Sequence, residues 1–308
     1  MRLIGWAIAL AAAGLTPAAA QAPASAPSQT ASATTATPAA TPAAAPIVYG
    51  SVGHMIPTPG IGEPDGRKGL QDQVTPIGKE AAAFHNNWLL TLCALISALV
   101  LILLVVALVR FRRGANPTPS RNSHNTLIEV VWTLLPVLIL VSIAIPSFKL
   151  LFLQLDLPKA DLTVKATGKQ WYWSYAYPDN GKFEFDSLLA QDKQPRLLGV
   201  DNEMVVPVNK IIRVQTTGAD VIHSFAVPAF GIKIDAIPGR LNETWFKATK
   251  TGMFYGQCSE LCGKDHAFMP IAVRVVSDQE FAAWVETAKK KFAANPANSF
   301  ASAGAAAQ

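Results

Sequence analysis

Charged residues are scarce in this chain of 308 residues. They make up 15% of it, whereas 50% of the residues are hydrophobic. A typical soluble domain carries about 25% charged residues, so this composition predicts membrane-spanning segments. The net charge is only +5, and acids and bases nearly balance from Asp156 onward. Without a basic patch on a docking motif, nucleic acid is not expected as a partner.

Cysteine is also rare, with three residues at positions 93, 258 and 262. The chain contains no Cys-x-x-Cys-His motif, so no c-type haem is expected to be attached to it. No cysteine follows the apolar N-terminal stretch, which argues against a lipoprotein signal. Cys93 is therefore expected to be a packing residue, and the other two, Cys258 and Cys262, lie four residues apart on one loop.

The first residues have the pattern of an export signal. Arg2 precedes an apolar run, and alanines at 18–20 fit a cleavage site. The alternative, a membrane anchor, is disfavoured because the run is short and breaks at Gly14 and Pro17. Residues 1–20 are therefore predicted to be a signal peptide, and the leader points to a bacterial source.

Low-complexity composition marks the regions on either side of the structured part. Residues 21–46 are nearly all Ala, Pro, Ser and Thr, a composition that cannot form a core and predicts a disordered tether. Residues 47–84, rich in Gly and Pro, are expected to be an exported and largely extended segment. Residues 295–308 are expected to be a disordered tail.

A two-helix transmembrane hairpin is predicted over residues 85–155. Its spans are about 88–109 and 127–155, each with an uncharged stretch long enough to cross the roughly 30 Å hydrocarbon core. The loop 110–126 contains no acid and should be cytoplasmic by the positive-inside rule, because it carries Arg110, Arg112, Arg113 and Arg121. Both chain ends then lie on the outer side, as the signal peptide also requires.

The second span begins with Thr126-Leu127-Ile128-Glu129, a capping-box pattern. On this interpretation Glu129 caps the start of a helix. An acid at the edge of a membrane span is also a candidate for function.

Residues 156–294 are predicted to form an exported all-β domain that ends in a helix. Short alternating segments separated by Gly, Pro and Asn favour a β-sandwich or barrel. The segment 170–177 is aromatic, and alternation puts Trp171, Trp173, Tyr175 and Tyr177 on one face. A capping box at 277–280 begins the final helix, whose apolar stripe is Phe281, Trp284, Ala288 and Phe292.

The loop 256–269 gathers the residues that favour metal chemistry. It carries Cys258, Cys262, His266 and Met269, and His223 is the candidate second imidazole. Soft sulfur ligands with imidazole favour copper, and two thiolates on one loop can bridge two ions. A disulfide is the first alternative, but its loop would be tight and would leave His266 and Met269 unexplained. Zinc is the second, although thioether is a poor zinc ligand.

This loop, together with residues 220–224 and 235–240, resembles subunit II of the haem-copper cytochrome c oxidases, over roughly residues 84–287. The resemblance implies a cupredoxin-like Greek-key barrel with a binuclear copper A centre. In that centre two coppers are bridged by the two cysteines, and its ligands would be His223, Cys258, Glu260 through its backbone carbonyl, Cys262, His266 and, weakly, Met269.

The resemblance also implies roles for single residues outside this ligand set. The Glu260 carboxylate would bind magnesium shared with subunit I, and Trp171 would receive electrons where cytochrome c docks. Glu129 would lie near the mouth of a proton pathway, which leaves open whether it serves protons or only caps the helix.

The family further implies an aa3-type oxidase in the bacterial inner membrane, surrounded by lipid. Its partners would be subunit I, which bears the haem, and subunit III, and this chain would carry no haem. Ala176 departs from the acid that the family often has there. A local docking patch would then depend on Asp179, Glu184, Asp186, Asp192 and Asp220.

Three other functions compete with this one. A membrane-tethered copper carrier would need exchangeable ligands, whereas six contacts in a barrel retain metal. The intact sulfur loop argues against a ubiquinol oxidase subunit. Nitrous oxide reductase shares the copper centre, but it lacks a two-span hairpin and needs a much longer chain.

Overall fold

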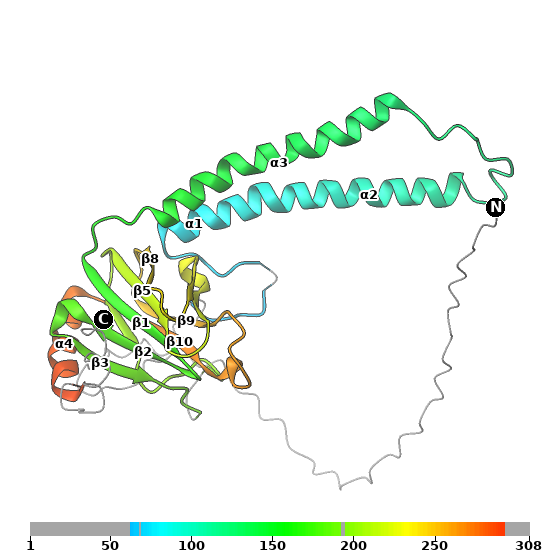
Figure 1. The fold of residues 1–308 in the computed structure, drawn as a ribbon. Coiled ribbons are helices and arrows are strands. Elements are labelled where there is room, and N and C mark those ends of the chain that lie inside the picture. The colour runs from blue at the N-terminus through cyan, green and yellow to red at the C-terminus, as the bar shows by residue number, and fades with distance from the viewer. Residues whose placement is uncertain (1–61, 68, 192–194, 293–308) are drawn as a thin grey trace, which may run out of the picture. The chain divides into compact units, whose positions relative to one another are not determined.

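The computed structural model describes residues 62–67, 69–191 and 195–292 (Figure 1). The predicted signal peptide 1–20, tether 21–46 and tail 295–308 lie outside the described residues, as does Asp192. The helices and strands lie within the three described ranges.

Two helical stretches are long and apolar enough to cross a membrane. The first runs over Pro76–Arg110 through α1 (Pro76–Ala83), the π-helical η1 (Phe84–Leu89) and α2 (Leu90–Arg110), and the second is α3 (Thr126–Leu155). The Thr75 side chain accepts a hydrogen bond from Gly78 N and caps the first stretch, with a proline at its first position. The end of the segment expected to be extended, from Pro76 onward, is therefore helical.

The start of α3 differs from the predicted capping box by one residue. Asn125 is the N-cap, and its Oδ1 accepts a hydrogen bond from Ile128 N at 3.2 Å. Glu129 Oε1 pairs instead with His124 Nδ1 at 2.8 Å. The capping-box interpretation of residues 126–129 was wrong, because Asn is as good an N-cap as Ser or Thr and occupies the position before Thr126.

The rest of the described chain is a two-sheet β-domain (Figure 1). One sheet has the order β3-β2-β1-β5-β8 and the other β4-β10-β9-β6-β7. The β1–β5 and β4–β10 pairs are parallel and the other strand pairs are antiparallel. The strands are β1 (Leu162–Lys169), β2 (Tyr172–Tyr177), β3 (Phe183–Ser187), β4 (Met204–Pro207), β5 (Ile212–Gly218), β6 (His223–Val227), β7 (Ile232–Ala236), β8 (Asn242–Phe246), β9 (Gly252–Cys258) and β10 (Pro270–Val276). The predicted fold class, a helical hairpin with an all-β domain, is confirmed.

Three short 3-10 turns and one helix complete the domain. The turns are η2 (Pro178–Asn180), η3 (Pro228–Phe230) and η4 (His266–Phe268), and the helix is α4 (Asp278–Phe292). The capping box at the start of α4 is confirmed, because Ser277 N donates to Glu280 Oε2 and Glu280 N donates to Ser277 Oγ. Trp284 packs on Tyr177 with ring centroids 5.0 Å apart, so the apolar stripe of α4 covers the aromatic end of the core.

The core lies between the two sheets, and β2 supplies its largest side chains. Trp173, Tyr175 and Tyr177 are fully buried, as the alternation of this strand predicts. The segment before α1 also joins this core, because Val74 is buried and forms backbone hydrogen bonds with Ala229 and Thr249. The chain entering the first helical stretch is therefore held on the β-domain.

Candidate metal centre

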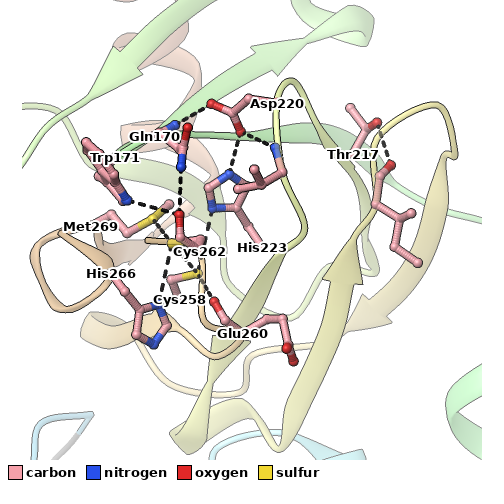
Figure 2. Close-up of polar contacts among 12 residues, drawn as sticks. Gln170, Trp171, Thr217, Asp220, His223, Cys258, Glu260, Cys262, His266 and Met269 are labelled. Atoms are coloured by element: carbon pink, nitrogen blue, oxygen red, sulfur yellow. Dashed lines mark hydrogen bonds and ion pairs between the residues drawn. The ribbon is translucent and has the colours of Figure 1, made fainter. Parts of the chain in front are cut away.

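Strand topology brings the predicted ligands together. His223 is the first residue of β6, and Cys258 is the last residue of β9. These two strands are neighbours, with Phe225 paired to Cys258. The loop that follows β9 carries Cys262 and His266 back over the same sheet end before β10 begins (Figure 2).

The sulfur atoms lie at the middle of the cluster. Cys258 Sγ and Cys262 Sγ are 3.8 Å apart, and both cysteines are free. A disulfide would require about 2.05 Å. His223 Nδ1 lies 3.9 Å from Cys258 Sγ, whereas His266 Nδ1 lies 3.5 Å from Cys262 Sγ. Each imidazole thus stands beside a different thiol, and the two thiols face each other between them.

Two weaker donors complete the set. Met269 Sδ is buried 3.4 Å from Cys262 Sγ, and the Glu260 carbonyl oxygen is 3.3 Å from Cys258 Sγ. The Glu260 side chain is exposed, and Figure 2 shows its carboxylate pointing away from the sulfurs. The backbone carbonyl and the carboxylate of Glu260 therefore face different surroundings.

The chemistry of this donor set fits copper better than zinc. The ligand atoms of His223, Cys258 and Cys262 lie within 4.8 Å of one another and could hold a metal ion. Four-coordinate structural zinc would be satisfied by Cys and His alone, which leaves no use for a buried thioether. Soft thiolate and thioether with imidazole suit copper, and the split of the two imidazoles between the two thiols suits a pair of ions.

Electrostatics separates the two thiols of the cluster. Burial disfavours the Cys258 thiolate, but the hydrogen bonds with His223 and with neighbouring groups together outweigh it and lower the pKa of Cys258. Burial and the neighbouring Cys258 charge raise the pKa of Cys262. Without metal the pair holds one negative charge more readily than two, because two adjacent thiolates repel each other. The positive charge of a bound metal would allow both sulfurs to ionise.

Asp220 orients His223 from the side opposite the sulfur. Its Oδ1 lies 2.8 Å from His223 Nε2, so the ring is held between this carboxylate and Cys258. Burial would lower the pKa of His223, but its bonds to Cys258 and Asp220 raise it. A carboxylate behind a ligating histidine fixes the tautomer and the ring orientation.

The ring of His223 also depends on β1 and β2. A Cβ atom at Gly168 would lie 2.8 Å from three side-chain atoms of His223, so only glycine leaves room for the ring there. Trp173 packs edge-on against the imidazole with ring centroids 6.1 Å apart. The histidine is therefore fully buried and confined on several sides.

Gln170 and Trp171, which directly precede β2, contact the backbone of Cys262. Trp171 Nε1 donates to the Cys262 carbonyl at 3.2 Å, and Gln170 Nε2 donates to the same oxygen at 2.8 Å. Lys264 Nζ lies 5.7 Å from the centre of the Trp171 ring. Trp171 is half-buried, so its ring links the surface to the backbone of a sulfur ligand.

Sequence reasoning missed the contributions of Gln170 and Asp220. Asp220 was grouped with surface acids, yet it lies at the buried histidine. Of the other acids in that group, Asp179 accepts a hydrogen bond from Thr163 N and Asp186 contacts Lys169 at 3.5 Å. A carboxylate three residues before a candidate ligand was the signal that could have identified Asp220. Glu129 is not part of this cluster, since it lies in the first turn of α3.

Two family models match the chain. The model described as "Cytochrome C oxidase subunit II, periplasmic domain" covers residues 162–276, and "Cytochrome C oxidase subunit II, transmembrane domain" covers residues 65–150. The two matches divide the chain as the structure does, with the helical hairpin in one and the β-domain in the other.

Similar proteins carry the same description. The chain is 50% identical over 236 residues to the probable cytochrome c oxidase subunit 2 of Rickettsia bellii, covering 75% of this chain and 87% of that protein. It is 44% identical over 255 residues to cytochrome c oxidase subunit 2 of Cereibacter sphaeroides, covering 74% and 83%. The crystal structure of the periplasmic domain of subunit II of cytochrome oxidase from Bradyrhizobium japonicum is 90% identical, covers 44% of this chain and 99% of that one, and has a TM-score of 0.44.

Proposed function

The chain belongs to the cytochrome c oxidase subunit II family, and we propose that it is the electron-accepting subunit of an aa3-type oxidase. It would take electrons from a separate cytochrome c at a copper A centre and pass them to haem in subunit I. Reduction of oxygen to water and proton pumping would take place in that haem-bearing partner.

The observation that carries this proposal is the placement of two facing thiols between two separate imidazoles. Cys258 and Cys262 would bridge two coppers, with His223 and His266 at the ends, and Met269 and the Glu260 carbonyl as weak ligands. When bound, such a copper pair supplies a one-electron carrier. The chain's own contribution is to bury the sulfurs and to fix His223 at the start of β6 and His266 in the turn η4, so that ligand positions change little during transfer.

Trp171 supports electron transfer from a docked donor. Its half-buried ring is joined by one hydrogen bond to the Cys262 carbonyl, which gives a short through-bond connection from the surface to a copper ligand. Lys264 beside the ring puts a positive charge at this spot. The docking surface would therefore be less acidic here than electrostatic steering of a basic cytochrome favours.

The Glu260 carboxylate is proposed as this chain's ligand to a magnesium ion shared with subunit I. Carboxylate oxygen is a hard donor that suits magnesium, which binds through one or two carboxylates and keeps several waters. The exposure of this side chain, directed away from the sulfurs, supports a contact with a partner subunit (Figure 2).

The membrane arrangement follows from the hairpin. The loop between α2 and α3, with its arginines, would face the cytoplasm of a bacterial inner membrane, and both termini and the β-domain would face the periplasm. The helices would contact lipid and subunit I, with subunit III as a further partner. Glu129 would lie at the cytoplasmic end, where its Oε1 lies 2.8 Å from His124 Nδ1, and it is the candidate for a proton pathway.

Purification of the complex from native membranes tests the proposal. We expect two coppers on this chain, haem on a co-purifying subunit, and oxidation of cytochrome c. Cys258→Ser should abolish the paramagnetic signal of the copper pair, because one bridging sulfur is lost. Cys93→Ser, in α2, is the matched control and should leave it unchanged. A chain purified without haem partners that gives its copper to a chelator within seconds would favour a copper carrier instead.

A further inference from the structure

Gln170 forms hydrogen bonds on two sides of the candidate metal centre. Its side chain donates to the Cys262 carbonyl, and its backbone N–H donates to Asp220, which contacts His223. We propose that Gln170 is a positioning residue that couples the Cys262 loop to His223 and so sets the geometry of the centre. This inference rests on the proposed copper function and adds a residue outside its ligand set.

The first contact holds the sulfur loop. Gln170 Nε2 donates to the Cys262 carbonyl at 2.8 Å, beside the longer bond from Trp171 Nε1 at 3.2 Å. Gly263 follows with a φ of +127°, and a Cβ there would lie 2.9 Å from the Trp171 ring. The Cys262–Gly263 peptide is therefore aimed at residues 170 and 171 and seated against them.

The second contact holds the histidine. Gln170 N donates to Asp220 Oδ2 at 2.7 Å, and Asp220 Oδ1 lies 2.8 Å from His223 Nε2. Figure 2 shows the resulting sequence of bonds, from the Cys262 carbonyl through Gln170 and Asp220 to the imidazole. Two candidate ligands, one at the start of β6 and one in the loop after β9, are thus joined through Gln170 and Asp220.

The backbone of Gln170 is held in place by hydrogen bonds of its neighbours. It directly follows β1, whose last residues Gly168 and Lys169 pair with Trp173 and Tyr172 of β2. The Gly168 carbonyl also accepts a hydrogen bond from Ala219 N at 2.9 Å, next to Asp220. The main chain at Gln170 is therefore anchored on both sides.

The chemistry at this position requires an amide of this length. The Cys262 carbonyl needs a donor, and a glutamate carboxylate would set an acceptor against an acceptor. Methionine has a similar length but no donor, so Gln170→Met removes the side-chain bond. The backbone bond to Asp220 remains in that variant, which leaves the fold of the strand intact.

The test compares Gln170→Met and Gln170→Glu with wild type in the full chain within its oxidase complex. Gln215→Met is the matched control, because the Gln215 amide on β5 also donates one hydrogen bond, to Glu243 Oε1 at 2.7 Å. The readouts are the rate of copper loss to a chelator, the copper hyperfine splitting in paramagnetic resonance, and the midpoint of thermal unfolding.

We expect Gln170→Met to lose copper roughly tenfold faster than wild type, as removal of a partner behind a metal ligand commonly does. Its hyperfine splitting should change, and Gln170→Glu should be affected at least as much. Thermal unfolding should match that of the Gln215→Met control.

Copper loss and hyperfine splitting equal to those of Gln215→Met would overturn the inference while leaving the copper function in place. A lowered unfolding midpoint with an unchanged spectrum would show a structural role only, which also overturns it. If wild type itself gives no spectrum of a copper pair, the proposed function fails, and this inference fails with it.

Discussion

At the scale of single residues, Glu260 contacts the candidate centre with its backbone carbonyl, and its side chain faces outward. Its carbonyl lies 3.3 Å from Cys258 Sγ, whereas its side chain is exposed. We expect Glu260→Gln to spare the copper signal, because the backbone is unchanged, and to weaken magnesium binding, because the charged oxygen is lost. Paramagnetic resonance of copper and of manganese substituted for magnesium measures both.

Asp265→Asn is the control for this prediction, since it removes another acid from the same loop. It should leave both signals near those of wild type. Equal loss of the copper and manganese signals in Glu260→Gln would contradict the division of work between the two ends of this residue.

Two buried tyrosines on β2 make a second residue-scale test. The Tyr177 hydroxyl donates to Val205 O and accepts from Val205 N, both at 2.8 Å, whereas the Tyr175 hydroxyl has no partner among the described residues. Tyr177→Phe should lower the free energy of unfolding by about 1–3 kcal/mol, because it leaves buried groups unpaired. Tyr175→Phe should leave it unchanged or raise it. Chemical denaturation of the full chain in detergent measures both, and equal losses would contradict the argument.

Tyr175 also predicts how the free energy of unfolding depends on pH. Burial raises the pKa of Tyr175 well above its usual value of 10.0. The unfolded chain therefore releases this proton near pH 10 while the folded chain keeps it, so the stability is unaffected below that pH and falls as the pH rises above it. Tyr175→Phe removes this loss. Its advantage in unfolding free energy should grow above about pH 10, and a difference that stays constant with pH would contradict the assignment.

The residues also show where sequence reasoning ends. Cys258, Cys262, His266 and Met269 could be singled out because they share one short loop. The place of Asp220 three residues before His223 was a signal, but the direction in which that turn faces does not show in the sequence, so Asp220 was grouped with the solvated acids.

At the scale of elements, β1 is what gives His223 its place. Gly168 leaves the space that the imidazole occupies, and an added Cβ would lie 2.8 Å from the ring. Gly168→Ala should cost about 1–3 kcal/mol of stability through overpacking. It should also displace His223, which reduces copper retention and alters the copper spectrum.

Gly69→Ala is the control for that prediction, because nothing lies within 4 Å of a Cβ at Gly69. Copper content and the spectrum should stay at wild-type values in this variant. A Gly168→Ala protein with an unchanged spectrum and full copper would show that β1 does not confine the ring.

Element type was easier to predict than element ends. Uncharged apolar stretches predicted two helices, and period-two alternation predicted β1 and the inward face of β2. The cap of α3 fell on Asn125 because several good capping residues stand next to one another there. The helix beginning at Pro76 was missed, because glycine and proline elsewhere in its segment outweighed the local signal of Thr75 and Pro76.

At the scale of the whole molecule, the hairpin and the β-domain are joined by more than the chain between α3 and β1. Val74 exchanges backbone hydrogen bonds with Ala229 and Thr249, and Thr75 Oγ1 donates to Phe230 O at 2.6 Å. Sequence pattern could not predict these contacts, because a single hydrophobic residue such as Val74 does not reveal its partner. The pairing of the two sheets likewise depends on contacts between residues far apart in the chain.

The central claim is that two thiols on one loop share a pair of copper ions. Paramagnetic resonance of the full chain, purified in its oxidase complex with copper bound, tests it most directly. The account predicts one unpaired electron spread over two copper nuclei, lost in Cys258→Ser and kept in Cys93→Ser. A spectrum of a single isolated cupric ion, or a protein without copper, would contradict it.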